Sequence, residues 1–146
     1  MAVIENSRAR FDYDILEELE AGIELLGTEV KSVRQGRGSL RGARVVVRGG
    51  EAYLVGASVP AWQEANAPAG YDPERSRRLL LTMKEIAQVA AAEGEKGLTV
   101  VPLKMYNNGR HLKLLIAIAR GKKKGDKRES IKKREEERRM RRSLKN

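Results

Sequence analysis

The chain has 146 residues, of which 40% are hydrophobic and six are Phe, Trp or Tyr, so it suits one domain with a modest aliphatic core and an appendage. It has no cysteine, which excludes disulfides, thiolate metal sites and cysteine nucleophiles, and its net charge of +10 favours an anionic partner. Residues 1–14 hold no apolar stretch of signal-peptide length, and the longest apolar run, Leu114 to Ala119, is far too short for a membrane span. We therefore expect a soluble cytoplasmic protein without a membrane partner.

The first elements are an arm and a strand. We expect residues 1–9 to form a loose N-terminal arm. From Tyr13 to Leu26 the apolar residues fall mostly on odd positions, and this period of two predicts a strand. Gly22 within it indicates a bulge or a bend.

A short helix and a hairpin follow. The residues from Gly27 to Arg34 predict the helix, with Thr28 as its cap and Gly36 at its end. Residues 44–55 contain two apolar runs around a Gly-Gly pair, which can supply the positive φ that a two-residue hairpin turn needs.

The middle of the chain predicts a loop, a strand and the longest helix. Residues 62–73 contain Asn, Gly and two prolines and are expected to form a loop. The segment from Arg77 to Leu81 has two arginines followed by three leucines, and we expect this basic-then-apolar run to form a short strand. Thr82 to Glu85 has the pattern of a capping box, and the helix that it begins would run to about Glu93 and close at Gly94.

A second hairpin is predicted where residues 98–106 and 111–119 flank the sequence Asn-Asn-Gly-Arg. One face of its second strand would carry four aliphatic residues, Leu112, Leu114, Ile116 and Ile118. About six short strands and one moderate helix predict a mainly β fold with helices, an OB-fold-like six-stranded antiparallel barrel that closes its own edges.

Residues 120–146 differ from the body, residues 1–119. They hold fourteen Lys and Arg against five Asp and Glu, whereas the body holds sixteen against fifteen. A basic tail of this density is typical of nucleic-acid binding, and the alternative is a tail that only keeps the protein soluble. Because it has too few apolar residues to bury a face, we expect the tail to be disordered when free and, being rich in helix formers, helical when a polyanion neutralises its charge.

Nothing in the sequence indicates catalysis. The single histidine, His111, begins a hairpin strand and has no recognisable partner for acid–base chemistry. The glutamates between residues 17 and 24 could bind a metal only with help from elsewhere, so a carboxylate-dependent nuclease is a remote alternative. We therefore expect a protein that is not an enzyme and that uses no metal or cofactor.

Six short segments carry a recognisable pattern. They are Asn6–Ala9, Glu20–Ile23, Gly27–Arg34, Asp72–Leu81, Val101–Leu103 and Gly121–Arg128. Their order and spacing resemble the SsrA-binding protein family, also called small protein B, from about residue 6 to about residue 134. One such segment alone would be weak, whereas six in order are highly specific.

The resemblance implies an OB-fold body that binds the tRNA-like domain of transfer-messenger RNA (tmRNA, or SsrA RNA). It implies a tail that enters the decoding centre and messenger-RNA channel of the small ribosomal subunit, in bacterial ribosome rescue by trans-translation, and a monomer bound to RNA. The body positions that it implies for RNA binding are Tyr13, Glu20, Lys31, Arg34, Arg75, Arg77, Arg78, Leu80 and Thr82. The tail positions that it implies for ribosome contact are Lys122, Lys123, Lys124, Asp126, Lys127, Arg128, Lys132, Lys133 and Arg134.

Three positions depart from the family pattern. Thr82 stands where the family often has His or Asn, so an RNA contact there is lost or changed. Trp62 stands where a smaller aromatic or apolar residue is expected. Gly125 precedes Asp126, where many members carry His or an aromatic residue, which puts a stacking contact with a ribosomal base in question.

The arginines before Leu81 have two possible roles. If residues 77–81 form a strand, Arg77 shares a face with Leu79, and Arg78 shares the other face with Leu80. The arginines of this segment could then bind phosphates beside a firm aliphatic surface, since guanidinium groups fork onto phosphate oxygens. Plain surface charge is the alternative.

Glu20 and Tyr13 each have two possible roles as well. Glu20 could accept hydrogen bonds from base edges or ribose 2′-hydroxyls, or it could only orient Lys31 or Arg34. Tyr13 could stack on a base or fill the core, and its place in the period-two pattern slightly favours the core.

Two classes of function remain. The first is a tmRNA-binding rescue factor. The second is a general basic protein of translation or ribosome assembly with an OB-like body, which would bind ribosomal RNA alone.

Overall fold

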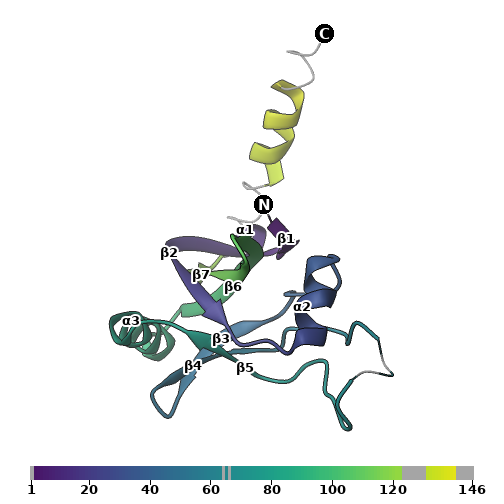
Figure 1. Ribbon diagram of the computed structural model, residues 1–146. Coiled ribbons are helices and arrows are strands. Elements are labelled where there is room, and N and C mark those ends of the chain that lie inside the picture. Colours follow the sequence, from purple (N-terminus) through teal and green to yellow (C-terminus); the bar gives the residue numbers. More distant parts are fainter. Residues whose placement is uncertain (1, 64, 66, 123–130, 141–146) are drawn as a thin grey trace.

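The computed structural model describes residues 2–63, 65, 67–122 and 131–140. Within these residues the body is one seven-stranded antiparallel sheet in the order β1-β6-β7-β2-β5-β4-β3, with three helices beside it (Figure 1). The strands are β1 (Ala2–Glu5), β2 (Tyr13–Ile23), β3 (Arg44–Arg48), β4 (Glu51–Val55), β5 (Arg77–Leu80), β6 (Leu98–Asn108) and β7 (His111–Gly121). The helices are α1 (Ala9–Asp12), α2 (Gly27–Arg34) and α3 (Met83–Gly94). The expected mainly β, antiparallel fold with helices is confirmed.

The prediction of a loose arm at residues 1–9 is wrong. Residues 2–5 form β1, which pairs with β6 and places Ile4, 7% exposed, in the core. The Asn6 side chain donates 2.9 Å to the Pro102 carbonyl and so fastens the turn that leads into α1. This strand brings the number of strands to seven instead of about six. Its pairing partner is about a hundred residues away in the sequence, so no local pattern announces it.

β2 is a strand as predicted, but its irregularity lies elsewhere. The register with β7 shifts between Ile15 and Glu17, so the bulge is there and not at Gly22. Gly22 pairs with Lys113 on one side and with Leu80 on the other. A Cβ at Gly22 would lie 3.0 Å from the Leu80 Cβ, so this glycine permits β2 and β5 to approach closely.

Both predicted hairpins are present. Gly49 and Gly50 have φ of 60° and 76°, the pair of positive values that a type I′ turn needs between β3 and β4. Between β6 and β7 the register pairs Asn108 with His111, so the turn residues are Gly109 and Arg110. Only Gly109 has a positive φ there, 65°, as in a type II′ turn.

The sheet has aliphatic residues on both faces. The predicted stripe on β7 faces the main core, because Leu114 and Ile116 are fully buried there with Leu54 and Leu79 from β4 and β5. The alternate β7 residues Ala117 and Ala119 face a smaller cluster that α1 covers through Ala9. Burying each large aliphatic side chain contributes about 1.5–3 kcal/mol, so this double-faced strand organises the body.

The helix caps agree only in part with the expectations. Thr28 is not the cap of α2: its hydroxyl accepts 2.8 Å from the Trp62 amide, and the amide of Leu26 is instead bound by a side chain from the first turn of the helix. Gly36, with φ of 75°, ends α2 as expected. Thr82 caps α3 as predicted, and Gly94 is the last helical residue of α3.

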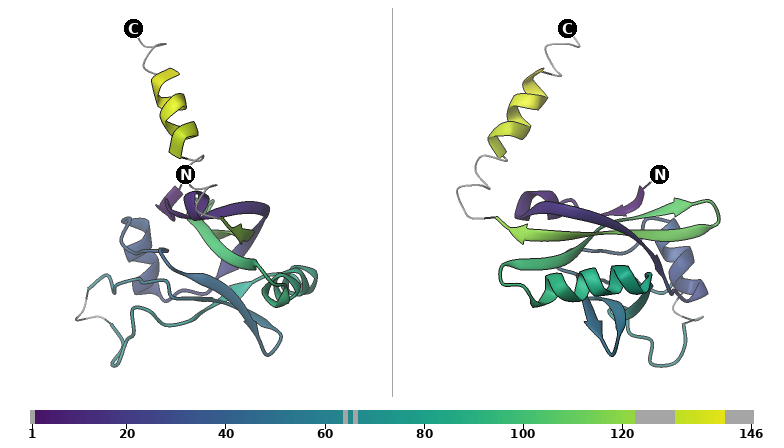
Figure 2. Two further views of the ribbon diagram at one scale, coloured as in Figure 1. Left: turned by 180° about the vertical axis from the view of Figure 1, so that it is seen from behind. Right: turned by 90° about the vertical axis from the view of Figure 1, so that its left-hand side faces the viewer.

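Residues 131–140 of the tail are helical, and every one of them is exposed. Figure 2 shows this helix extending from the end of the body that carries the N-terminus and α1. Ten residues without a buried face make a helix that is marginal in water, so disorder of the free tail stays a prediction. No helix in the described residues is long and apolar enough to cross a membrane.

Candidate nucleic-acid interface

A buried carboxylate lies between α2 and the segment that leads into β5. Glu29 is 0% exposed and binds the Leu26 amide at 2.7 Å, which caps α2. It also accepts from the Tyr71 hydroxyl at 2.9 Å and from the Nη2 atoms of Arg75 at 2.5 Å and Arg77 at 2.7 Å. Two arginines therefore share one carboxylate, and the three charges hold α2 against the chain between Tyr71 and Arg77.

Arg77 does not fit the expected role in RNA binding. Its side chain is 0% exposed, and its guanidinium donates to Glu29 and to the carbonyls of Pro73 and Ala57. No donor of this group is left to reach a phosphate at the surface. The face assignment itself holds, because Arg77 and Leu79 point inward together. The expectation failed because the sequence did not reveal the carboxylate that neutralises Arg77, 48 residues earlier.

Burial raises the pKa of Glu29, but the hydrogen bonds from Arg75, from the Leu26 amide and from Arg77 outweigh it and lower the pKa from 4.5 to about 2. The carboxylate is therefore ionised at any physiological pH. The pKa of Tyr71 is raised by burial and by its hydrogen bond to Glu29, so its hydroxyl stays a donor. This network is a structural one with fixed protonation states.

The outward side of α2 carries the two predicted cations. Arg34 is exposed and donates from Nη2 to the Arg110 carbonyl at 2.7 Å, which links α2 to the turn between β6 and β7. The side chain of Lys31 is exposed and makes no hydrogen bond or ion pair within the described part of the chain. Neither charge is neutralised by a carboxylate of the described residues, so both remain available to an anionic ligand.

The outward face of β5 is different, because its cation is engaged. Arg78 donates from Nη1 to Glu24 at 2.8 Å and from Nε to Glu51 at 3.0 Å, and these bonds raise its pKa. One guanidinium between two carboxylates gives the group a net charge of −1. Beside it lies Leu80, 49% exposed, over the bare backbone of Gly22. This face thus offers an aliphatic contact surface rather than free positive charge.

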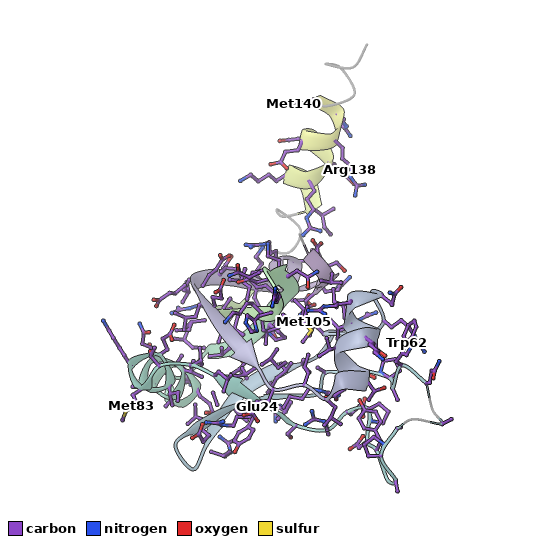
Figure 3. All side chains as sticks on the ribbon, viewed as in Figure 1. Glu24, Trp62, Met83, Met105, Arg138 and Met140 are labelled. Atoms are coloured by element: carbon purple, nitrogen blue, oxygen red, sulfur yellow. The ribbon has the colours of Figure 1, made fainter. Side chains whose placement is uncertain are left out.

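Met83 extends the apolar character of this face toward α3. Its side chain is 89% exposed at the first position of the helix, and Figure 3 shows it pointing away from the body. Thr82 lies between Leu80 and Met83, but its hydroxyl accepts 3.2 Å from the Glu85 amide as the cap of α3. The hydroxyl is thus already partly used for the fold.

Glu20 is exposed on β2, and its partner is neither Lys31 nor Arg34. The hydroxyl of Tyr106, from β6, reaches across β7 and donates a short hydrogen bond to the Glu20 carboxylate. Burial and then this bond raise the pKa of Tyr106 to about 12. The structure therefore does not support the alternative in which Glu20 orients the α2 cations, and Glu20 is itself held in position by Tyr106.

The structure does not bring all predicted residues of the body together. Tyr13 pairs with Gly121 at one end of β2, while Gly22 pairs with Leu80 at the other end. The length of strand between Tyr13 and Gly22 spans roughly 30 Å. Tyr13 is half-buried against the smaller apolar cluster beside α1, in agreement with the core alternative. The predicted set thus occupies two separate parts of the surface.

The predicted tail residues lie partly at the end of the body, partly on the helical segment and partly outside the described residues. Lys122 is the last described residue of the body, and Lys132, Lys133 and Arg134 are exposed on the helical segment. Five predicted residues lie outside the described part of the chain, Lys123, Lys124, Asp126, Lys127 and Arg128, as does the departure at Gly125. Among the described residues no group of three or more His, Cys, Asp or Glu could hold a metal ion.

The residues of the candidate site and of the buried network behind it that the sequence did not single out include Glu29, Tyr106 and Glu51. Glu29 belongs to one of the six matched segments but has the pattern of an ordinary exposed helix residue. Tyr106 lies in a predicted strand, and a polar aromatic opposite a strand glutamate is a cross-strand pair that only the register reveals. Glu51 lies in the predicted hairpin, and its approach to Arg78 depends on β4 and β5 being neighbours.

Comparison with known proteins agrees with the resemblance noted in the sequence. The SsrA-binding protein of Microcystis aeruginosa is 46% identical over 143 residues, covering 98% of this chain and 93% of that protein. The SsrA-binding protein of Latilactobacillus sakei is 45% identical over 142 residues, covering 97% and 90%. A solved structure described as "tmRNA-SmpB: a journey to the center of the bacterial ribosome" superimposes with a TM-score of 0.70 at 42% identity, over 90% of this chain and 95% of that chain. A family model described as SmpB protein matches residues 3–146, and the chain therefore belongs to the SmpB family.

Proposed function

We propose that the protein binds tmRNA and acts with it in trans-translation, the rescue of stalled bacterial ribosomes. The observation that carries this proposal is the similarity to SsrA-binding proteins over nearly the whole chain, together with a structural relative in a tmRNA–SmpB assembly on the ribosome. The role is one of binding and delivery, and the family description names no catalytic activity. A general ribosome-assembly role has no comparable support.

The tRNA-like domain binds the body at the outward face of β5 and along α2. The half-exposed Leu80 gives the RNA an apolar contact, while Lys31 and Arg34 supply charges that no carboxylate of the described residues neutralises. Glu20, held by Tyr106, accepts hydrogen bonds from base edges or 2′-hydroxyls, which adds selectivity for RNA. Arg75 and Arg77 support this face from inside through Glu29.

The tail contacts the small ribosomal subunit and enters the decoding centre and messenger-RNA channel. Its described cations, Lys132, Lys133 and Arg134 among them, are exposed on a helix without a buried face. A helix that is marginal in water becomes stable when fixed phosphates offset the repulsion among its charges. The tail therefore needs its RNA partner for order as well as for affinity.

An affinity pull-down from bacterial cells, followed by sequencing of the bound RNA, tests the function. We expect one structured RNA with a tRNA-like end to be enriched above ribosomal RNA. Recovery of ribosomal RNA alone would contradict the proposal and favour a ribosome-assembly protein.

The contact face is tested by two exposed leucines on the same body. Leu80→Asp should weaken binding of the tRNA-like domain by about tenfold or more, the equivalent of losing about 1.4 kcal/mol of contact. Leu16→Asp is the matched control, because Leu16 is 54% exposed on β2 away from Leu80. Equal losses in the two variants would show only that added negative charge repels RNA, and the face would then be assigned wrongly.

A further inference from the structure

Glu20 differs from the other glutamates around the contact face, because no cation binds it. Glu24, Glu29 and Glu51 are each bound to at least one arginine. The Glu20 carboxylate forms no ion pair in the described part of the chain, and it receives a hydrogen bond from the hydroxyl of Tyr106. A neutral donor therefore holds this carboxylate in place without cancelling its charge.

The strand register explains how Tyr106 reaches Glu20. The strands β2, β7 and β6 are neighbours in the sheet (Figure 1). Glu20 pairs with Leu115 on β7, and Leu115 pairs with Lys104 on β6. Tyr106 lies two residues beyond Lys104 on the same face of β6, so its side chain approaches Glu20 diagonally across β7. The backbones of β2 and β6 are separated by roughly 10 Å, twice the spacing of neighbouring strands, and a long side chain is needed to bridge them.

The ring of Tyr106 is itself held by a cation. The Nζ atom of Lys104 lies 5.6 Å from the centroid of this ring, within the range of a cation–π interaction. Lys104 forms no ion pair with a carboxylate of the described residues, so its charge is directed to the ring and not to Glu20. Lys104, Tyr106 and Glu20 thus form an array that crosses three strands, in which each member restrains the next.

The protonation state of Tyr106 fixes the direction of its hydrogen bond. Burial, and then the bond to Glu20, raise the pKa of Tyr106 to about 12, so the hydroxyl keeps its proton at physiological pH. That single proton is given to Oε2 of Glu20. Tyr106 therefore has no proton left to donate to RNA, whereas Oε1 of Glu20 accepts no hydrogen bond from the residues that the structure describes.

The array borders the contact face proposed for the tRNA-like domain. Gly22 lies two residues after Glu20 on the same side of β2, and it pairs with Leu80. A carboxylate at this position repels phosphates, so it favours binding only where its free oxygen meets a donor of the RNA. A freely rotating glutamate would also lose its rotamer freedom when the RNA binds. The bond from Tyr106 restricts the carboxylate before binding and so reduces this loss.

We infer that Tyr106 is a positioning residue for RNA recognition, which fixes the Glu20 carboxylate in the direction of a base N–H or ribose hydroxyl of the tRNA-like domain. This inference rests on the proposed function and deepens it, because it assigns a role in binding to a residue that acts only through Glu20. The hydroxyl of Tyr106 carries this role, while the ring and Lys104 hold the hydroxyl in place.

The test is a double-mutant cycle on the full chain, measured as binding to a transcript of the tRNA-like domain. Tyr106→Phe keeps the ring and removes only the hydroxyl, and it should weaken binding by about three- to tenfold, the cost of ordering one free side chain. The slope of log affinity against log salt should stay unchanged, because no phosphate contact is lost. In a Glu20→Ala background, Tyr106→Phe should change the affinity by less than about twofold, since no carboxylate is left to position.

Gln88→Met is the matched control, because it removes another hydrogen bond to a β2 carboxylate, from Nε2 of Gln88 to Glu17 at 3.4 Å. It should bind within about twofold of the unaltered protein. Unchanged affinity of Tyr106→Phe would overturn the inference. An equal loss with and without Glu20 would also overturn it, since Tyr106 would then act independently of that carboxylate. Failure of the unaltered protein to bind the transcript would instead refute the proposed function, on which the inference rests.

Discussion

At the scale of single residues, Glu29 decides the state of two arginines that the sequence offers to RNA. It binds Arg77 in the interior and Arg75 at the margin, and Tyr71 completes its coordination. Removing one partner of such a buried group leaves an uncompensated charge in the interior. The resulting loss in the free energy of unfolding is far larger than the stabilisation that an exposed ion pair contributes. The RNA contact proposed near β5 thus depends on a carboxylate that is buried beneath the surface.

We expect Glu29→Gln to lower the free energy of unfolding by about 3–5 kcal/mol at neutral pH. The native pKa of about 2 lies below the ordinary 4.5, so the stabilisation is complete above about pH 4.5 and is lost as the pH falls toward 2. The unaltered protein should lose about 3 kcal/mol over this range, because each tenfold change in proton affinity corresponds to about 1.4 kcal/mol. Urea unfolding at about pH 5 and about pH 2.5 checks this, with Glu95→Gln as the control. The same pH dependence in Glu29→Gln would assign the acid sensitivity to other carboxylates.

Glu24 and Glu51 bind Arg78 at the exposed face of β5, whereas Glu29 binds its arginines from the interior. Glu24 and Glu51 accept hydrogen bonds from the Nη1 and Nε atoms of Arg78, and they leave the group with a net negative charge. We expect Glu24→Gln with Glu51→Gln to raise the affinity for unstructured RNA several-fold and to steepen its salt slope by about 0.7–0.9, one new phosphate contact. Filter binding with oligouridylate measures this.

Glu74→Gln with Glu95→Gln changes the net charge equally without freeing Arg78, and it serves as the control. A similar rise in both double variants would mean that overall charge, and not the release of Arg78, sets the affinity. A rise confined to the first pair would identify these glutamates as a device that disfavours random RNA.

At the scale of the elements, α2 shows how a short helix is fixed. Thr28, Glu29 and Ser32 all bind the segment between Pro60 and Arg77, the last through a 2.6 Å bond to the Pro60 carbonyl. Lys31 and Arg34 lie on the exposed side. The cations of α2 therefore have a fixed direction, which isolated helix propensity could not supply for so short a segment.

Thr82 connects the fold of α3 with the contact face. We expect Thr82→Ala to cost about 1 kcal/mol of stability, because Asn, Asp, Ser and Thr are good caps and Ala is not. Thr82→Asn should keep the cap, and it restores a residue type that the family often has there. Thermal unfolding together with binding of the tRNA-like transcript separates the two roles: the Asn variant should bind at least as tightly as the unaltered protein. Weaker binding by a stable Asn variant would mean that the Thr methyl group itself contacts RNA.

Elements with a local signal were predictable, and contacts between distant elements were not. The alternation in β2 and β7, the glycine turns and the capping box at Thr82 all depend on residues close in sequence. β1 has four residues and owes its existence to pairing with β6. Likewise Lys31 and Arg34 are exposed on α2 where expected, whereas the burial of Arg77 depends on Glu29. The sequence therefore indicated which residue types belong to the site, whereas their contact partners could be identified only once the order of the strands was known.

At the scale of the whole molecule, the charges are distributed unevenly. The tail provides most of the net charge, and within the body Arg75, Arg77 and Arg78 near β5 are all paired with glutamates. The division at residues 119 and 120 stays a proposal, but the structure suggests moving the cut. β7 runs to Gly121, and Lys122 binds α1.

We therefore expect a protein ending at Lys122 to fold and to bind the tRNA-like transcript within about threefold of the full chain, while its affinity for small subunits falls steeply. Its net charge is about +3, from eighteen basic and fifteen acidic residues. A protein ending at Arg120 is the comparison, and it should unfold at lower temperature because the bonds to Asp12 and Arg10 are lost. Loss of all RNA binding by the longer version would refute a separable body and tail.

The anchor at Lys122 also limits the distance that the tail can reach from the body. Eight residues separate it from the helical segment that starts at Ile131, so the helix can begin no farther than roughly 30 Å from α1 whatever path the chain takes. The ten helical residues add about 15 Å of reach. Once the body is bound, the charges of residues 131–140 are confined to that radius, at an effective concentration in the millimolar range. The proposed entry of the tail into the messenger-RNA channel therefore requires that the channel lie within this distance of the bound body.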